Sequence, residues 1–162
     1  MIGISGWSGS GKTSIIVKLI IVFKKKYNKE VCVIKRAHED FTIDHKGKDS
    51  FKFSQAGAKR VIVSSRVKWV MLNHDIDKEL KLEELIDIAG KQDIVIIEGW
   101  KEGKFKKIEI FRSELKKNPL YTEDKNFIAI ATNDKDFKPM RKITLLDLNN
   151  EEEIADFIIN DY

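Results

Sequence analysis

A glycine-rich segment of eight residues near the amino end limits this chain to few folds. It reads Gly6-Trp7-Ser8-Gly9-Ser10-Gly11-Lys12-Thr13 and fits the pattern G-x-x-x-x-G-K-[ST]. An apolar run precedes it, and helical periodicity from Thr13 to about Lys26 follows it. Small residues let a backbone wrap closely around a phosphate, and the start of a helix adds a positive dipole end. The segment therefore predicts a phosphate-binding loop between a strand and a helix; the alternative is a glycine-rich turn without a ligand.

The main chain of such a loop holds most of the anion. Every residue from Gly6 to Thr13, together with Ser14, is therefore a candidate nucleotide contact. We expect Lys12 to reach the β- and γ-phosphates and the Thr13 hydroxyl to bind Mg²⁺. The helix that follows is apolar on nearly every side, which predicts that it is buried against a sheet and fixes the loop at its start.

Seven short apolar runs predict β-strands, because runs of this length without alternation are typical of strands buried on both faces. Helical patterns between several of them indicate a mostly parallel sheet. We predict an α/β fold, a mostly parallel P-loop NTPase sheet flanked by helices, in a single domain over residues 1–162. The predicted strands are Ile2–Ile4, Val31–Ile34, Val61–Val63, Trp69–Leu72, Ile94–Ile97, Phe127–Ala131 and Ile143–Leu146; the predicted helices are Thr13 to about Lys26, about Ser50–Ala58, Leu82–Ala89 and Asn150–Ile159.

The segment 104–111 departs from this pattern, since Ile108 and Ile110 alternate with Lys107 and Glu109. Alternation is typical of a strand with one exposed face, so we predict an edge strand or a protruding β-ribbon here. The polar residues 112–126, which include a proline, predict a surface loop.

Acidic residues at strand ends separate into two groups, because ligands of open α/β sheets bind beyond the carboxyl ends of the strands. Asp93 precedes the run Ile94–Ile97, whereas Glu98 follows it, so only Glu98 is expected to face a nucleotide. A carboxylate there can bind Mg²⁺ or orient a nucleophilic water, which makes Glu98 a candidate catalytic and metal-binding residue. The alternative is an ion pair between Glu98 and a lysine such as Lys101.

Two other polar segments follow predicted strands. Residues 35–50 carry both charge signs, as a loop facing a Mg²⁺ nucleotide would, although Asp49-Ser50 could instead cap a helix. Asn133 and Asp134 follow the run Phe127–Ala131, where a carboxylate or amide could recognise guanine. A plain polar turn explains the same two residues.

Composition excludes several classes of protein. Cys32 is the only cysteine, which rules out a disulfide framework or a thiolate metal cage within one chain and favours a reducing, cytoplasmic location. The longest apolar stretch, Ile15–Phe23, is interrupted by Lys18 and is too short to span a membrane. The net charge of +4, from 30 Lys+Arg and 26 Asp+Glu, gives no reason to expect nucleic acid or a membrane as a partner.

Several motifs occur together in a fixed order along the chain. They are the Gly6–Thr13 loop, a stretch with His38, Asp44, Gly47-Lys48-Asp49-Ser50 and Ala56-Gly57-Ala58, then Glu98-Gly99-Trp100-Lys101, and finally Phe111-Arg112. In that order they resemble the molybdopterin-guanine dinucleotide biosynthesis protein B family, over nearly the whole chain. The chain departs from the family in having fewer histidines near His38, Trp100 in place of Phe, and Asn133-Asp134 in place of a directly placed Asp.

The resemblance implies a GTP-binding, weakly GTP-hydrolysing accessory protein of molybdenum cofactor biosynthesis. It implies a homodimer that assists the molybdenum cofactor guanylyltransferase, with GTP and Mg²⁺ as cofactors and molybdopterin as a further candidate ligand. By position, Gly6–Thr13 inherit the triphosphate-binding role. Lys48, Asp49 and Glu98 inherit roles toward the Mg²⁺ nucleotide or the substrate, with Asp49 as a metal ligand beside Thr13 and Glu98.

Slow hydrolysis agrees with the lack of an obvious arginine finger, since only five arginines are present. Of these, Arg112 could act across a dimer. The alternative function is a small-molecule P-loop kinase that transfers the γ-phosphoryl group with the same loop, although such enzymes commonly carry an arginine-rich lid. A nucleic-acid-binding module is a third hypothesis, and it lacks a basic-aromatic motif.

Overall fold

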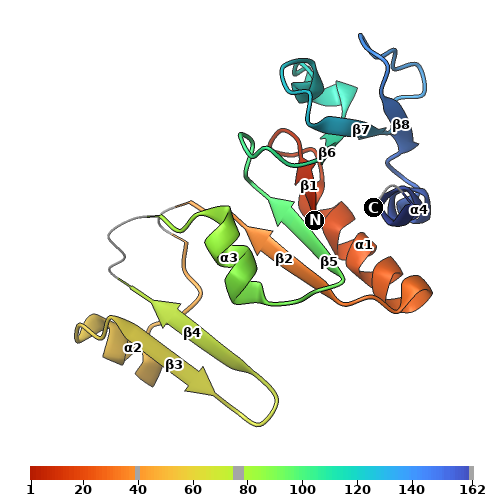
Figure 1. Cartoon of the computed structure of the whole chain (residues 1–162). Helices are drawn as coiled ribbons and strands as arrows, with labels where there is room; N and C mark the ends of the chain where they lie inside the picture. The colour runs from red at the N-terminus through yellow and green to blue at the C-terminus, as the bar shows by residue number, and fades with distance from the viewer. Residues whose placement is uncertain (39–40, 75–78, 161–162) are drawn as a thin grey trace. The chain divides into compact units, whose positions relative to one another are not determined.

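The computed structural model describes residues 1–38, 41–74 and 79–160 (Figure 1). The chain forms two compact units. The first comprises Met1–Arg36 and Ile86–Tyr162, and the second comprises Ala37–Leu85. Whether the two units act as the single domain expected from the length stays a prediction.

A six-stranded parallel sheet forms the centre of the first unit, in the strand order β2-β5-β1-β6-β7-β8. The apolar runs noted above supply five of these strands, which confirms the predicted parallel sheet. The strands are β1 (Ile2–Ser5), β2 (Val31–Lys35), β5 (Ile94–Glu98), β6 (Lys107–Phe111), β7 (Phe127–Thr132) and β8 (Thr144–Asp147).

Helix α1 (Lys12–Tyr27) buries one face against this sheet. Ile15, Ile16, Leu19 and Phe23 are buried at helical spacing, and they share one core with the isoleucines of β1, β5 and β6. The predicted burial of this helix against the sheet is therefore confirmed, although its opposite face is open to solvent. Exposed on that face are Val17 and Ile21.

Helix α4 (Glu151–Asn160) lies beside α1 in the first unit (Figure 1). Ile154 and Ile158 join the core, while the outer edges of the two helices carry ion pairs. In those pairs Lys18 lies 3.2 Å from Glu151, and Lys26 lies 2.9 Å from Asp156. The covering helix keeps α1, and hence the loop before it, in a fixed place on the sheet.

The prediction of an edge strand or protruding ribbon at 104–111 is wrong. Strand β6 lies inside the sheet between β1 and β7, and all five of its residues are buried. Its two charged side chains have partners: Lys107 Nζ lies 2.7 Å from Oδ2 of the partly exposed Asp124, and the Glu109 carboxylate accepts hydrogen bonds from two backbone N–H groups. Because these partners satisfy the charges, an alternating sequence fits a central strand.

The expected surface loop at 112–126 is likewise only partly at the surface. It contains two short 3₁₀ turns, η1 (Ser113–Leu115) and η2 (Leu120–Thr122), and Tyr121 is only 1% exposed. The Glu109 carboxylate accepts from the backbone nitrogens of Leu120 at 2.7 Å and Tyr121 at 2.9 Å. This segment is therefore anchored to the sheet rather than loose.

The second unit contains α2 (Asp49–Gln55) and an antiparallel ribbon of β3 (Arg60–Ser64) and β4 (Trp69–Asn73). Both strands were expected to be buried on two faces, and the ribbon instead leaves Ile62 62% and Trp69 68% exposed. Helix α3 (Leu82–Ala89) follows along the chain before β5.

Candidate phosphate-binding site

The loop between β1 and α1 has the backbone shape that its glycines permit. Gly6 has φ +154°, and a Cβ atom there would lie 2.4 Å from the carbonyl oxygen of Ile110 and 2.7 Å from Ser10 Oγ. Gly11, which precedes the first residue of α1, has φ +93°. Both positions favour glycine, since L side chains rarely adopt such φ values and the space at Gly6 is already filled.

The inside of this loop is lined by donors that lack acceptors. Among the described residues, no hydrogen-bond acceptor faces the backbone N–H groups of Gly11, Lys12, Thr13 and Ser14. The Ser10 hydroxyl is buried and also has no partner. Buried polar groups are nearly always paired, and the first N–H groups of a helix attract anions. The observed geometry fits a bound phosphate.

Lys12 folds across the same loop. Its Nζ donates to the carbonyl oxygens of Gly6 at 3.0 Å and Trp7 at 2.9 Å. Burial lowers the pKa of Lys12, the charges of Lys101 and Lys35 lower it further, and Glu98 opposes the change. The ammonium group thus stands at the loop, and a phosphate would compete for it with two carbonyl oxygens.

Glu98 lies at the carboxyl end of β5, as the direction of the strand predicts. The strand pairs with β1 at Ile4 and with β2 at Lys35, which brings Glu98 next to the strand that carries the loop. The residue is 8% exposed, and its Oε2 lies 3.8 Å from Lys35 Nζ. The ion pair weighed as an alternative therefore exists, but with Lys35, while Lys101 lies over the Trp7 ring.

Asn133 and Asp134 follow β7, two strands away from β1. Asn133 Nδ2 donates to Glu114 Oε1 at 2.7 Å, and its Oδ1 is buried without a partner. Asp134 Oδ1 accepts from the backbone nitrogen of Asp136 at 3.0 Å, as in a polar turn. Recognition of a base by these residues stays a prediction.

Lys48 and Asp49 belong to the second unit, where they begin α2. The Asp49 carboxylate forms an exposed ion pair with Lys52, 3.1 Å apart. Their predicted roles toward a Mg²⁺ nucleotide remain predictions, and two residues of the same polar stretch, Glu39 and Asp40, lie outside the described residues. Within the described ranges no three His, Cys, Asp or Glu side chains gather as a metal site.

Sequence reasoning missed a second segment that touches the loop, residues 112–118 after β6. Arg112 Nε donates to the carbonyl oxygen of Ser10 at 3.0 Å, and Trp7 Nε1 donates to that of Asn118 at 2.8 Å. A Cβ atom on Gly9 would lie 3.7 Å from Leu115 Cδ2. Only the placement of β6 beside β1 brings these groups together, and the alternating pattern at 104–111 concealed that placement.

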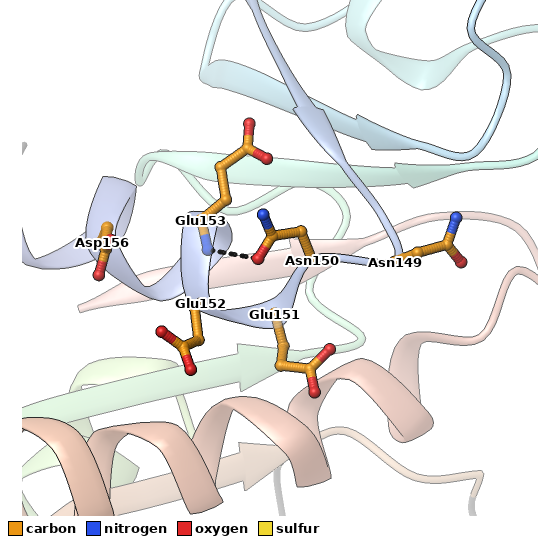
Figure 2. Close-up of a pocket in the computed structure, with 6 residues that line it drawn as sticks. All are labelled: Asn149, Asn150, Glu151, Glu152, Glu153 and Asp156. Atoms are coloured by element: carbon orange, nitrogen blue, oxygen red, sulfur yellow. Dashed lines mark hydrogen bonds between the residues drawn. The ribbon is translucent and has the colours of Figure 1, made fainter.

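A separate surface hollow of about 510 Å³ lies at the start of α4 (Figure 2). Its lining is acidic, and no residue of the phosphate-binding loop belongs to it. The side chain of Asn150 accepts from the Glu153 N–H at 3.1 Å, so this end of the helix is already capped. A polyanion would be repelled there, so this hollow is not a candidate phosphate site. The lining residues are Asn149, Asn150, Glu151, Glu152, Glu153 and Asp156.

The described part of the chain contains no helix that is both long and apolar enough to cross a membrane.

The sequence profile of one protein family, molybdopterin guanine dinucleotide synthesis protein B (MobB), matches residues 1–133.

Two relatives are similar over almost the entire chain. The molybdopterin-guanine dinucleotide biosynthesis adapter protein of Haemophilus influenzae is 36% identical, over 99% of this chain and 88% of the relative. The protein of the same name from Escherichia coli is 32% identical, over 98% of this chain and 91% of the relative. Among solved structures, Bacillus subtilis MobB has a TM-score of 0.74 at 19% identity, covering 98% of this chain and 95% of that one. This last likeness concerns the fold alone.

Proposed function

The chain belongs to the molybdopterin guanine dinucleotide synthesis protein B family, and from this membership we propose an adapter of molybdopterin guanine dinucleotide biosynthesis that binds GTP with Mg²⁺ and hydrolyses it slowly. The observation that carries the nucleotide site is the set of unpaired N–H groups from Gly11 to Ser14 around the buried hydroxyl of Ser10. These donors need acceptors, and phosphate oxygens supply them.

The side chains of the site have separate proposed roles. Lys12 would leave the carbonyl oxygens of Gly6 and Trp7 to neutralise the β- and γ-phosphates. The Thr13 hydroxyl and Glu98 would hold Mg²⁺, and Glu98 would also orient the attacking water. The role of Asp49 as a metal ligand stays a prediction. Mg²⁺ retains several waters and phosphate oxygens, so few protein ligands suffice.

We further propose a homodimer in the cytoplasm that assists the guanylyltransferase which attaches GMP to molybdopterin. The printed names of the two relatives, which call them biosynthesis adapter proteins, support a role beside another enzyme of the pathway. Direct binding of molybdopterin and recognition of guanine by Asn133 and Asp134 belong to the same proposal.

Calorimetric titration of the purified protein with GTP, ATP and GMP under identical Mg²⁺ concentrations tests the nucleotide site. We expect GTP to bind more tightly than ATP and GMP. We also expect Lys12→Ala to lower the affinity for GTP by at least about tenfold. Lys142→Ala removes the same charge from an exposed position outside the site, and it should leave binding unchanged. Equal affinity of Lys12→Ala and the unchanged protein would contradict the assignment.

Hydrolysis is tested separately with labelled GTP and Mg²⁺, with and without small-molecule acceptors. Slow release of inorganic phosphate that does not depend on an acceptor is the expected result. Transfer of the γ-phosphoryl group to an acceptor would instead identify a kinase.

A further inference from the structure

Arg112 reaches the phosphate-binding loop from within the same chain. It follows β6, and β6 pairs in parallel with β1, with Ser5 opposite Glu109. The loop leaves the end of β1, so the residue after β6 lies where the loop begins. Arg112 Nε donates to the carbonyl oxygen of Ser10 at 3.0 Å, and this is a side chain to main chain contact across 102 residues of sequence.

The direction of that carbonyl decides the direction of the next amide. In a trans peptide the C=O of one residue and the N–H of the next point to opposite sides. Because the Ser10 oxygen accepts from Arg112, the Gly11 N–H points to the opposite side of the peptide, and it has no acceptor among the described residues. Arg112 thus fixes the orientation of the first donor of the unpaired series.

Two more observations favour this role. A Cβ atom on Gly11 would lie 3.7 Å from Arg112 Nη2 and 3.8 Å from Nε, so the guanidinium lies close beside the glycine. Among the hydrogen bonds of the described residues, the one that Arg112 makes goes to the Ser10 carbonyl oxygen, and the charge of Arg112 also acts on the Glu114 carboxylate, whose pKa is lowered mainly by its hydrogen bonds. The direct hydrogen bond of this charged side chain is thus made to the loop.

We propose that Arg112 is a positioning residue for the bound nucleotide, acting in its own chain by holding the Ser10–Gly11 peptide in the phosphate-binding orientation. The inference rests on the proposed binding of GTP. The donors from Gly11 onward would hold phosphate groups that GTP and GDP share. Loss of Arg112 therefore lowers the affinity for both nucleotides by the same factor.

The test compares Arg112→Ala, Arg112→Lys and Arg112→Gln by titration with GTP and GDP in Mg²⁺. Arg66→Ala is the matched control, since Arg66 lies in the exposed turn between β3 and β4. Loss of a hydrogen bond from a charged donor lowers affinity about tenfold or more. Arg112→Ala is therefore expected to lower the affinity for GTP and the affinity for GDP about tenfold each. Lys and Gln, which can still donate to a carbonyl oxygen, should recover part of that loss.

A second measurement needs no nucleotide. The Ser10 N–H donates to the carbonyl oxygen of Trp7 at 3.1 Å, and its hydrogen exchange can be followed by NMR in the unliganded protein. We expect exchange at Ser10 to be at least about fivefold faster in Arg112→Ala, while exchange at Leu148, which donates to Thr132 at 3.0 Å, stays unchanged. If Arg112→Ala does not fold, Arg112→Gln takes its place.

The outcomes separate the two proposals. Unchanged affinity or unchanged exchange at Ser10 would overturn the role of Arg112, and so would a loss confined to GTP, which would indicate contact with the terminal phosphate. If the unchanged protein and Arg66→Ala bind no nucleotide, the proposed function fails, and the exchange at Ser10 still decides whether Arg112 orders the loop.

Discussion

The indole Nε1 of Trp7 lies 2.8 Å from the backbone oxygen of Asn118, which ties the phosphate-binding loop to the segment after β6. The ammonium groups of Lys101 and Lys117 lie 5.2 and 5.7 Å from the centre of a Trp7 ring. Trp7 therefore joins the loop to two other segments of the first unit. A ligand that moves the loop must change the surroundings of this ring.

Binding of the Mg²⁺ nucleotide should change the fluorescence of Trp7. We expect a shift in tryptophan emission on titration with GTP, because the ring would change its contacts with Asn118 and the two lysines. The Trp7→Phe variant should lose the shift, whereas Trp69→Phe, which alters an exposed tryptophan of the ribbon, should keep it. A shift that survives in a variant with both Trp7→Phe and Trp100→Phe would show that the ligand acts elsewhere, since Trp100 follows Glu98 by two residues.

Gly6→Ala should destabilise the protein far more than an alanine at Gly90. At Gly6 the added Cβ would lie 2.4 Å from a backbone oxygen, at φ +154°, whereas at Gly90 nothing lies within 4 Å of it and φ is +69°. We expect Gly6→Ala to lower the free energy of unfolding by about 3 kcal/mol or more and Gly90→Ala by about 1–2 kcal/mol. Urea unfolding measures both, and equal losses would contradict the close packing at Gly6.

The buried carboxyl of Glu109 should make stability depend on pH. Burial raises its pKa above the ordinary 4.5, while the hydrogen bonds from Leu120 and Tyr121 oppose the rise. The folded protein then binds this proton more tightly than the unfolded chain, so stability falls as the pH rises from about 4.5 through the raised pKa.

Glu109→Gln removes this titration, because a carboxamide does not ionise in that range. The free energy of unfolding of the unchanged protein should therefore fall relative to that of Glu109→Gln as the pH rises above about 4.5. Urea unfolding at a series of pH values measures the difference. Two parallel curves would refute the raised pKa.

Lys107→Met should be strongly destabilising, because it leaves the Asp124 carboxylate without the cation that lies 2.7 Å away. Removing one partner of a fully buried ion pair typically costs about 3–5 kcal/mol, and since the Asp124 side chain is 25% exposed we expect a loss below that range. Lys104→Met, at an exposed position nearby, should change the free energy of unfolding by less than about 0.5 kcal/mol. The double variant Lys107→Met with Asp124→Asn should recover part of the loss. No recovery would mean that the loss comes from the packing of Lys107 and its hydrogen bond to the Lys101 carbonyl oxygen rather than from the ion pair.

The parallel sheet could be predicted because its apolar runs are local signals. The direction of the chain also separated Asp93 from Glu98: Asp93 Oδ2 accepts from the backbone nitrogen of Glu30 at the amino end of β5, while Glu98 lies at the carboxyl end. Strand β6 was misread because burial of Lys107 and Glu109 depends on partners 11 to 17 residues further along the chain.

The exposed ribbon was misread for the opposite reason. The apolar runs of the ribbon, Val61–Val63 and Trp69–Leu72, resemble those of the core strands. The sequence of an apolar strand does not reveal whether another element packs against its faces. In the candidate site the loop itself is a continuous motif and was predictable, whereas the contact of Arg112 with Ser10 required β6 to be placed next to β1.

A crystal structure grown with Mg²⁺ and a non-hydrolysable GTP analogue tests the nucleotide site most directly. The account predicts phosphate oxygens within hydrogen-bond distance of the backbone nitrogens of Gly11, Lys12 and Thr13, with Lys12 Nζ moved from the carbonyl oxygens of Gly6 and Trp7 to the phosphates. A loop without the analogue at millimolar concentration, with Lys12 still bonded to those two oxygens, would contradict it.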